Sequence, residues 1–270
     1  MNIYYTTIKG RRNSNEDRHN IILNIHNENK NVNDINMLSI YDGHGGTYVS
    51  DYLCNNLPLY YCHRELKPPF SKEYHNKVFK INQEKILKNK KGNFSGSTCL
   101  LNIMYKFNKE IYFNTVNLGD CRLVIVYKNG NVKQVTTDHK PDNSIEKNRI
   151  NKLGGEIYND SEGVTRIGDL SVSRAFGDGD NAPYISYLPD IYYNKITPDI
   201  KYIVMGCDGL WDVINNNDLH ELLELYSQKT KINLAADLAN EALIRNTTDN
   251  VSVIVIEITS YDDMIDCIKM

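Results

Sequence analysis

The chain has 270 residues, 41% hydrophobic and 24% charged, which is an ordinary globular composition and long enough for one large core. Its formal net charge of -3 gives no electrostatic reason to expect nucleic acid or an anionic membrane as partner. No stretch approaches the ~20 apolar residues of a membrane span, and the amino terminus lacks a basic region followed by an apolar one. We therefore expect an intracellular protein, cytoplasmic with the nucleus left open, that binds neither nucleic acid nor membrane.

The cysteines show no C-x-x-C spacing, and several lie within apolar runs, where a reduced thiol packs as a small hydrophobic group. They stand at Cys54, Cys62, Cys99, Cys121, Cys207 and Cys267. Reduced, structural cysteines fit a reducing compartment.

Apolar runs and turn signals predict the elements in chain order. Strands are expected at residues 21–25, 37–40, 98–104, 111–117, 123–127, 132–136, 202–205 and 251–256. Helices are expected at residues 47–56, 71–90, 144–153, 219–228 and 234–245. Asn129-Gly130 is a plausible hairpin turn, and Gly154-Gly155 is a suitable stop for the third helix.

Strands grouped ahead of helices, without regular βαβ alternation, favour an antiparallel α+β architecture in which two helices on each flank cover two stacked sheets. Without a Pro- or Gly/Ser-rich linker, we expect one domain over residues 1–260 and a short tail over 261–270. Residues 27–33 are expected to form a polar surface loop. Residues 178–190, rich in Gly, Asp, Asn and Pro, are either a surface loop or an active-site flap. Without a heptad repeat, we expect a monomer.

Acidic clusters attached to apolar runs are scattered over almost the whole chain. Acids at the ends of buried strands need compensation, because an uncompensated buried charge costs several kcal/mol. One divalent cation site would compensate all of them if they converge in space. The clusters are Asn15-Glu16-Asp17, Tyr41-Asp42-Gly43-His44-Gly45-Gly46, Cys207-Asp208-Gly209-Leu210-Trp211-Asp212 and Asp249-Asn250.

Each motif also has a simpler interpretation. Asp42-Gly43 alone is a turn signal, but the following His44 adds an ionisable ring, and Gly43 lets its carbonyl approach a cation closely. Arg12 lies in a polar stretch that could be an exposed loop, and its guanidinium is equally suited to a phosphate.

The later acids are open to the same alternatives. Asp120 ends a strand in a plausible hairpin turn, and Asp249 could be a simple strand entry. Asp208 and Asp212 are four residues apart, which on a helical turn places both carboxylates on one side, with Trp211 between them in the core.

The donor types favour Mg²⁺ or Mn²⁺ over Zn²⁺, because oxygen donors predominate and no paired Cys or His-x-x-x-His spacing occurs. Hard cations with shared carboxylates suit hydrolysis of a phosphoester by a bridging hydroxide. No G-x-x-x-x-G-K-[ST] loop, kinase motif set, G-x-S-x-G elbow or Cys-x5-Arg loop points to another phosphate chemistry.

Taken together, the motifs resemble the metal-dependent serine/threonine protein phosphatases of type 2C, the PPM family. The match runs in order over nearly the whole chain. It consists of Arg12-x-x-x-Glu16-Asp17, Tyr41-Asp42-Gly43-His44-Gly45-Gly46, Gly96-Ser97-Thr98, Asn117-Leu118-Gly119-Asp120-Cys121-Arg122, Asp138-His139-Lys140-Pro141, Glu146-x-x-Arg149-Ile150 with Gly154-Gly155, Leu170-Ser171-Val172-Ser173-Arg174-Ala175-Phe176-Gly177-Asp178, Cys207-Asp208-Gly209-Leu210-Trp211-Asp212 and Asp249-Asn250-Val251-Ser252.

The resemblance implies a central antiparallel β-sandwich flanked by pairs of α-helices, with two Mg²⁺ or Mn²⁺ ions at one end of the sheets. In this family Asp42 would bridge both ions, and Asp208 and Asp249 would bind the first. Glu16 and the Gly43 carbonyl would hold the second, partly through water. The implied activity is hydrolysis of phosphoserine and phosphothreonine in proteins by a bridging water or hydroxide, without a covalent intermediate.

The remaining positions receive roles in the same way. Arg12 would bind the substrate phosphate, and Asp17 would support the metal ligands from behind. His44 would be the general acid that protonates the departing Ser or Thr oxygen. Asp120 and Asp212, with Asp208 shared, would form a third, weaker metal site. Residues 178–190 look short for the flap of this family.

Two alternatives stay open. A non-catalytic phosphoprotein-binding relative would be expected to lack an acid at Asp42, Asp208 or Asp249, and all three are present. A hydrolase of small phosphomonoesters is the other alternative, and comparison of a phosphopeptide with a sugar phosphate would discriminate it.

Overall fold

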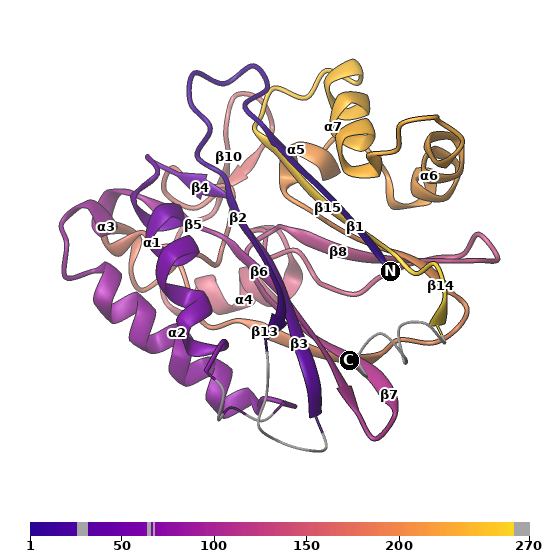
Figure 1. Cartoon of the computed structure of the whole chain (residues 1–270). Coiled ribbons are helices and arrows are strands. Elements are labelled where there is room, and N and C mark those ends of the chain that lie inside the picture. The colour runs from indigo at the N-terminus through magenta and orange to yellow at the C-terminus, as the bar shows by residue number, and fades with distance from the viewer. Residues whose placement is uncertain (26–31, 64–65, 67, 262–270) are drawn as a thin grey trace.

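Two antiparallel sheets lie face to face, each with helices on its outer face, in a computed structural model that describes residues 1–25, 32–63, 66 and 68–261 (Figure 1). The first sheet has the strand order β1-β15-β14-β8-β9. Its strands are β1 (Asn2–Ile8), β8 (Arg122–Tyr127), β9 (Val132–Gln134), β14 (Ile200–Gly206) and β15 (Val251–Glu257). The second sheet has the order β13-β7-β6-β3-β2. Its strands are β2 (Arg18–Ile25), β3 (Val32–Tyr41), β6 (Cys99–Phe107), β7 (Glu110–Leu118) and β13 (Asp190–Lys195).

The central strands are apolar on both faces because both faces are covered. In β14, Ile203 and Met205 join the core between the sheets, whereas Tyr202 and Val204 pack toward the outer helices. This two-residue alternation separates the two cores, although the strand itself reads as a continuous apolar run.

Pairs of helices form the outer layers, so the order of layers is α-β-β-α (Figure 1). The sheet containing β3 is covered by α1 (Tyr48–Asn56) and α2 (Lys72–Ile86), and the sheet containing β15 by α6 (Leu219–Ser227) and α7 (Leu234–Ile244). Ser71 caps α2, because its hydroxyl accepts a hydrogen bond from the Tyr74 amide (3.2 Å). No helix in the described ranges is long and apolar enough to cross a membrane.

Short elements connect these layers near one end of the sheets. They are η1 (Leu57–Tyr60), α3 (Lys91–Phe94), α5 (Asp208–Trp211), η3 (Asn216–Asp218) and a small sheet of β4 (Gly43–His44), β5 (Gly96–Ser97) and β12 (Phe176–Gly177). Between β9 and β13 the chain makes an excursion with a small core of its own. It contains α4 (Ser144–Lys152), the hairpin β10 (Tyr158–Asn159) and β11 (Thr165–Arg166), and η2 (Gly179–Asn181).

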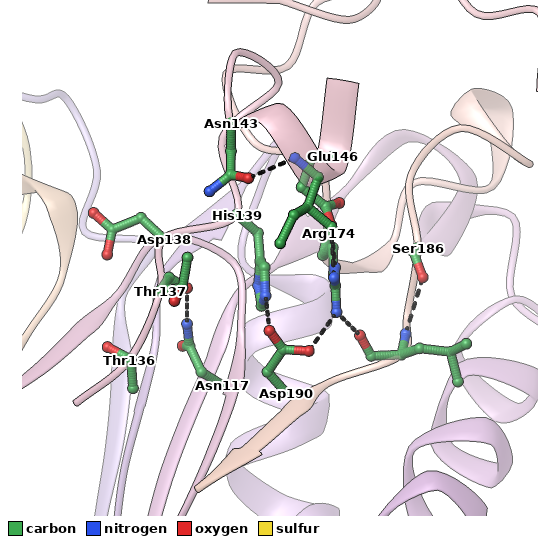
Figure 2. A network of polar contacts seen from close by, with 12 residues as sticks. Asn117, Thr136, Thr137, Asp138, His139, Asn143, Glu146, Arg174, Ser186 and Asp190 are labelled. Carbon is green, nitrogen blue, oxygen red and sulfur yellow. Dashed lines mark hydrogen bonds and ion pairs between the residues drawn. The ribbon is translucent and has the colours of Figure 1, made fainter. Parts of the chain in front are cut away.

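A network of charged side chains fixes this excursion to the second sheet (Figure 2). Glu146 of α4 accepts hydrogen bonds from Arg149 and Arg174, and Arg174 also pairs with Asp190 of β13 (3.0 Å). His139 Nδ1 accepts from the Gly119 amide, so Nε2 carries the proton and donates to Asp190 (3.2 Å). These two partners, His139 first, lower the pKa of Asp190 to about 2.

The structure confirms the predicted α+β sandwich and corrects details. The helix expected over 71–90 ends at Ile86, after which a turn leads to α3. Strands β1 and β13 were not predicted, because both are partly exposed edge strands with mixed polar and apolar residues. The Asn129-Gly130 turn is confirmed, since the Gly130 amide donates to the Tyr127 carbonyl. The loop expected at 27–33 lies largely outside the described residues, as do residues 262–270 of the tail.

Candidate metal centre and active site

The acidic clusters meet where central strands of both sheets end. Asp42 follows the last residue of β3, and Asp208 follows β14 and starts α5. Asp249 immediately precedes Asn250 and β15, while Glu16 lies in the loop between β1 and β2. Four separate segments therefore deliver carboxylates to one end of the sandwich.

These groups line a cavity of about 510 Å³. Eight of the ten predicted site residues are in its lining: Arg12, Glu16, Asp42, Gly43, His44, Asp120, Asp208 and Asp249. Asp17 is buried next to the cavity without lining it. Asp212 is exposed at the end of α5 and does not line it either, although its amide donates to the Asp208 carbonyl in the predicted helical turn.

The carboxylates of the cavity repel one another strongly. Burial raises the pKa of Asp42 well above its ordinary value, and the negative charges of Asp17 and Asp208 raise it further. Burial raises the pKa of Asp208 well above its ordinary value, and the negative charge of Asp120 raises it further. Positive charge at this place would relieve the repulsion, which is the electrostatic signature of a cation site.

Asp17 closes the base of the site. Its carboxylate accepts a hydrogen bond from Ser252 Oγ (2.6 Å), yet burial raises its pKa to about 6. Asp17, Asp42 and Cys207 each place one ligand-type atom within 4.8 Å of the others. Burial raises the pKa of the Cys207 thiol well above its ordinary value, so the thiol stays protonated and the donors to a cation are the carboxylates.

Asn250 joins the β1–β2 loop to the start of β15. Its side-chain amide donates to the Lys9 and Ser14 carbonyls (2.7 and 2.9 Å), and its Oδ1 accepts from the Glu16 amide (2.9 Å). Gly43 permits the same loop to approach, because a Cβ there would lie 2.5 Å from the Glu16 carbonyl oxygen. The position of Glu16 is thus set by backbone and amide contacts on both sides.

His44 is held by a buried acid. Its Nε2 lies 2.9 and 2.8 Å from the two carboxylate oxygens of Asp178, whose side chain is 3% exposed. Asp178 has a left-handed backbone (φ 49°), which a non-glycine residue adopts only when its surroundings impose it. No hydrogen bond to the other ring nitrogen, Nδ1, occurs in the described part of the chain, so Nδ1 is the nitrogen left for a ligand in the cavity.

Two cations neutralise part of the acidic lining. Arg12 pairs with Asp249 (2.6 Å) and is 58% exposed, so its guanidinium lies at the mouth of the cavity. Lys140 donates to Asp120 Oδ2 (2.7 Å). Burial alone would lower the pKa of Lys140, but Asp120 and Asp208 raise it above its ordinary value. Lys140 is therefore a permanent positive charge on this side of the site.

The far wall of the cavity comes from the excursion between β9 and β13. Arg166 and residues 169–172 contribute to the lining, whereas no residue of 178–190 does. The flap predicted at 178–190 stays a prediction, and the wall that the structure provides precedes it in the chain.

The donor set fits Mg²⁺ or Mn²⁺. Asp42, Asp208, Asp249, Glu16 and the Gly43 carbonyl supply hard oxygen atoms around one cavity, and no imidazole or thiolate competes among the lining residues except His44, which Asp178 engages. The raised pKa values of Asp42 and Asp208 show an acidic excess that the protein's own cations leave uncompensated. Fold and site together define a metal-dependent hydrolase of phosphate esters.

Comparison with known proteins identifies the family. A family model for protein phosphatase 2C matches residues 2–251. A PP2C-like domain-containing protein of Acanthamoeba polyphaga mimivirus is 40% identical over 175 residues, 55% of this chain and 96% of that protein. Probable protein phosphatase 2C 28 of Arabidopsis thaliana is 30% identical over 85% of this chain, which spans about two thirds (66%) of the plant protein. The crystal structure of serine-threonine phosphatase 2C from Toxoplasma gondii has the same fold, with a TM-score of 0.76 at 21% identity over 94% of each chain.

The chain belongs to the protein phosphatase 2C family and is a metal-dependent protein serine/threonine phosphatase. The predicted family, fold and enzyme class are confirmed, and so is dependence on Mg²⁺ or Mn²⁺. The number of ions and the role of each site residue stay predictions.

Proposed function

We propose that this cavity hydrolyses phosphoserine and phosphothreonine in proteins by direct attack of water, with two divalent ions at its core. The observation that carries the proposal is the convergence of Asp42, Asp208, Asp249 and Glu16 from four segments on one cavity with an arginine at its mouth. When bound, Mg²⁺ or Mn²⁺ lowers the pKa of a water molecule and offsets charge on the phosphoryl group.

Each carboxylate has a proposed part in holding the ions. Asp42, whose pKa is raised by burial and by the charges of Asp17 and Asp208, would be shared by both ions, and Asp208 and Asp249 would hold the first. Glu16 and the Gly43 carbonyl hold the second, on the side where Asn250 and the Gly46 amide fix Glu16. Asp17, which places a carboxylate oxygen within 4.8 Å of an Asp42 oxygen, would support Asp42 from the buried side of the site.

Arg12 and His44 act on the substrate. The Arg12 guanidinium, exposed at the mouth, would donate hydrogen bonds to two phosphate oxygens from its planar fork. His44 gives its proton to the departing Ser or Thr oxygen, since an alkoxide is a poor leaving group. Asp178 keeps the ring oriented.

His44→Ala is expected to lower kcat on a phosphothreonine peptide by about 10²–10⁴-fold, and to lower it far less on p-nitrophenyl phosphate. The nitrophenolate leaves without protonation, so it does not need the acid. Asp178→Asn should show the same pattern in weaker form. Steady-state kinetics on both substrates measure this, and an equal loss on both would remove His44 from the role of acid.

Protein substrates are the class we propose, because the cavity is open at a face where a phosphorylated side chain can enter beside Arg12. A sugar phosphate is the competing substrate class. We expect kcat/KM to be well above the sugar-phosphate value when the substrate is a phosphothreonine peptide. The reverse order would favour a hydrolase of small phosphomonoesters.

Metal removal is the first test of the whole proposal. Purified protein with Mn²⁺ or Mg²⁺ is expected to release phosphate from a phosphothreonine peptide, and excess EDTA should abolish the release until metal is restored. Folded protein that releases nothing with either metal would instead favour a phosphoprotein-binding role.

We also propose an intracellular, cytoplasmic, monomeric protein. The cysteines at positions 54, 62, 99, 121 and 207 are free thiols, which suits a reducing compartment, and Cys267 lies outside the described residues. Light scattering after size-exclusion chromatography tests the monomer, for which about 31.1 kDa is expected.

A further inference from the structure

Lys140 contacts one of the carboxylates that line the cavity. It belongs to the segment after β9, and its Nζ donates to Asp120 Oδ2 at 2.7 Å. The Asp120 side chain is 1% exposed, whereas that of Lys140 is 32% exposed. One end of this ion pair is therefore fixed in the protein, and the other can reach solvent.

The ammonium group of Lys140 is also close to the acids of α5. Asp208 and Asp212 both act on it electrostatically, in addition to Asp120. These three carboxylates are the ones that would form a third metal site. The two arginines of the cavity lining pair with other acids, Arg12 with Asp249 and Arg166 with Asp160.

We propose that Lys140 and a third divalent cation compete for Asp120, so that Lys140 sets the affinity of the third ion site. The proposal rests on the two-ion centre proposed above, together with the third site that the family resemblance implies at these carboxylates. The carboxylate that accepts from Lys140 is one of the three that a cation beside Asp208 and Asp212 would use. A cation can enter only by displacing the ammonium group or by lying next to it.

Either route weakens the third ion. Displacement gives up a charge-assisted hydrogen bond to a buried carboxylate, and coexistence places like charges a few ångströms apart in a partly water-excluded site. Lys140 thus supplies a tethered positive charge at low metal concentration, and the ion replaces it only at high concentration. The partial exposure of Lys140 gives its side chain room to move aside.

Lys140→Met tests this competition, because it keeps the length of the side chain and removes its charge. The Kd of the weakest Mn²⁺ site, measured by isothermal titration calorimetry with equilibrium dialysis for stoichiometry, is expected to fall about tenfold or more. Lys140→Arg keeps the charge and should bind the third ion weakly. Lys133→Met, at an exposed lysine of β9, is the matched control and should bind like the native protein.

The double variant Lys140→Met with Asp120→Asn tests whether the gain in Mn²⁺ affinity depends on Asp120. If the added affinity belongs to Asp120, it disappears in the double variant. An unchanged third Kd in Lys140→Met, or a gain that persists without Asp120, would overturn the proposal. Native protein that binds no Mn²⁺ at all would instead refute the metal centre itself, so the two failures are distinct.

Native protein provides a second measurement that needs no variant. Acylation of Lys140 by a water-soluble ester, followed by mass spectrometry, is expected to be slow while Asp120 holds the ammonium group. It should accelerate in the range of Mg²⁺ concentration that fills the third site, after the tight sites are full. Acylation that stays constant or slows across this range would contradict displacement.

Discussion

Asp42→Asn is expected to lower kcat on a phosphothreonine peptide by at least about 10³-fold while the protein stays folded. Burial raises the pKa of Asp42 well above its ordinary value, and the negative charges of Asp17 and Asp208 raise it further. The neutral amide keeps the shape of the side chain but removes the charge that both ions would share in the proposed site. Because the acidic crowding is also relieved, the variant without metal should unfold at a higher urea concentration than the native protein without metal.

The control is another carboxylate of the same cavity. Asp169 lies in the lining but outside the proposed ligand set, so Asp169→Asn should change kcat by less than about tenfold. Stability of both variants is compared by urea unfolding with and without Mn²⁺. Full activity in Asp42→Asn would refute the bridging role, and a similar loss in both variants would mean that cavity charge in general matters rather than this position.

The sandwich could be predicted because its central strands are recognisable in the sequence as apolar runs. Buried strands such as β14 and β15 are apolar over most of their length, and helices α6 and α7 begin within a residue of the predicted starts. The edge strands β1 and β13 lack that signal, because one side of each is open and their residues are mixed. Their place in the sheets is fixed by backbone pairing with β15 and β7, which sequence pattern does not reveal.

The site residues also divide into those that the sequence predicts and those whose contacts only the fold reveals. Carboxylates beside strand ends were predictable, since acids next to buried strands demand compensation. The partners of those residues were not, because they depend on contacts between distant segments. Asp178 contacts His44, which is 134 positions away in the sequence, and Asn250 contacts Glu16, which is 234 positions away. Asp178 and Lys140 do stand in motifs that the sequence shows, but only the fold indicates which side chain each contacts.

The fold also explains why the cavity wall and the metal centre belong to different parts of the chain. The proposed metal ligands Asp42, Asp208 and Asp249 adjoin β3, β14 and β15, which lie inside their sheets, and packing on both faces limits the movement of these strands. The opposite wall is carried by the excursion, whose own core is small and whose attachment depends on charged groups. Loss of that attachment should therefore alter the cavity without displacing the metal ligands.

Glu146→Gln is expected to destabilise the protein by about 3 kcal/mol at pH 7, because breaking a buried ion pair leaves an uncompensated charge. The Glu146 side chain is 1% exposed and pairs with Arg149 and Arg174. Burial alone would raise its pKa, but Arg174 brings it below the ordinary value of 4.5. Its charge therefore stabilises the fold fully above about pH 4.5, and this contribution is lost as the pH falls through the lowered folded pKa.

Urea unfolding at pH 7 and at lower pH measures both effects of this substitution. The difference between native protein and Glu146→Gln should be complete at pH 7 and should shrink below pH 4.5, because there the carboxyl of the unfolded chain takes up protons before the folded one, whose pKa is lowered. Glu162→Gln, at an exposed position of the same excursion, should change stability by less than about 0.5 kcal/mol. Below its unfolding transition, Glu146→Gln should still bind Mn²⁺ at the core site while KM for a phosphopeptide rises. Weakened Mn²⁺ binding at the core would mean that the excursion also holds the metal ligands in place.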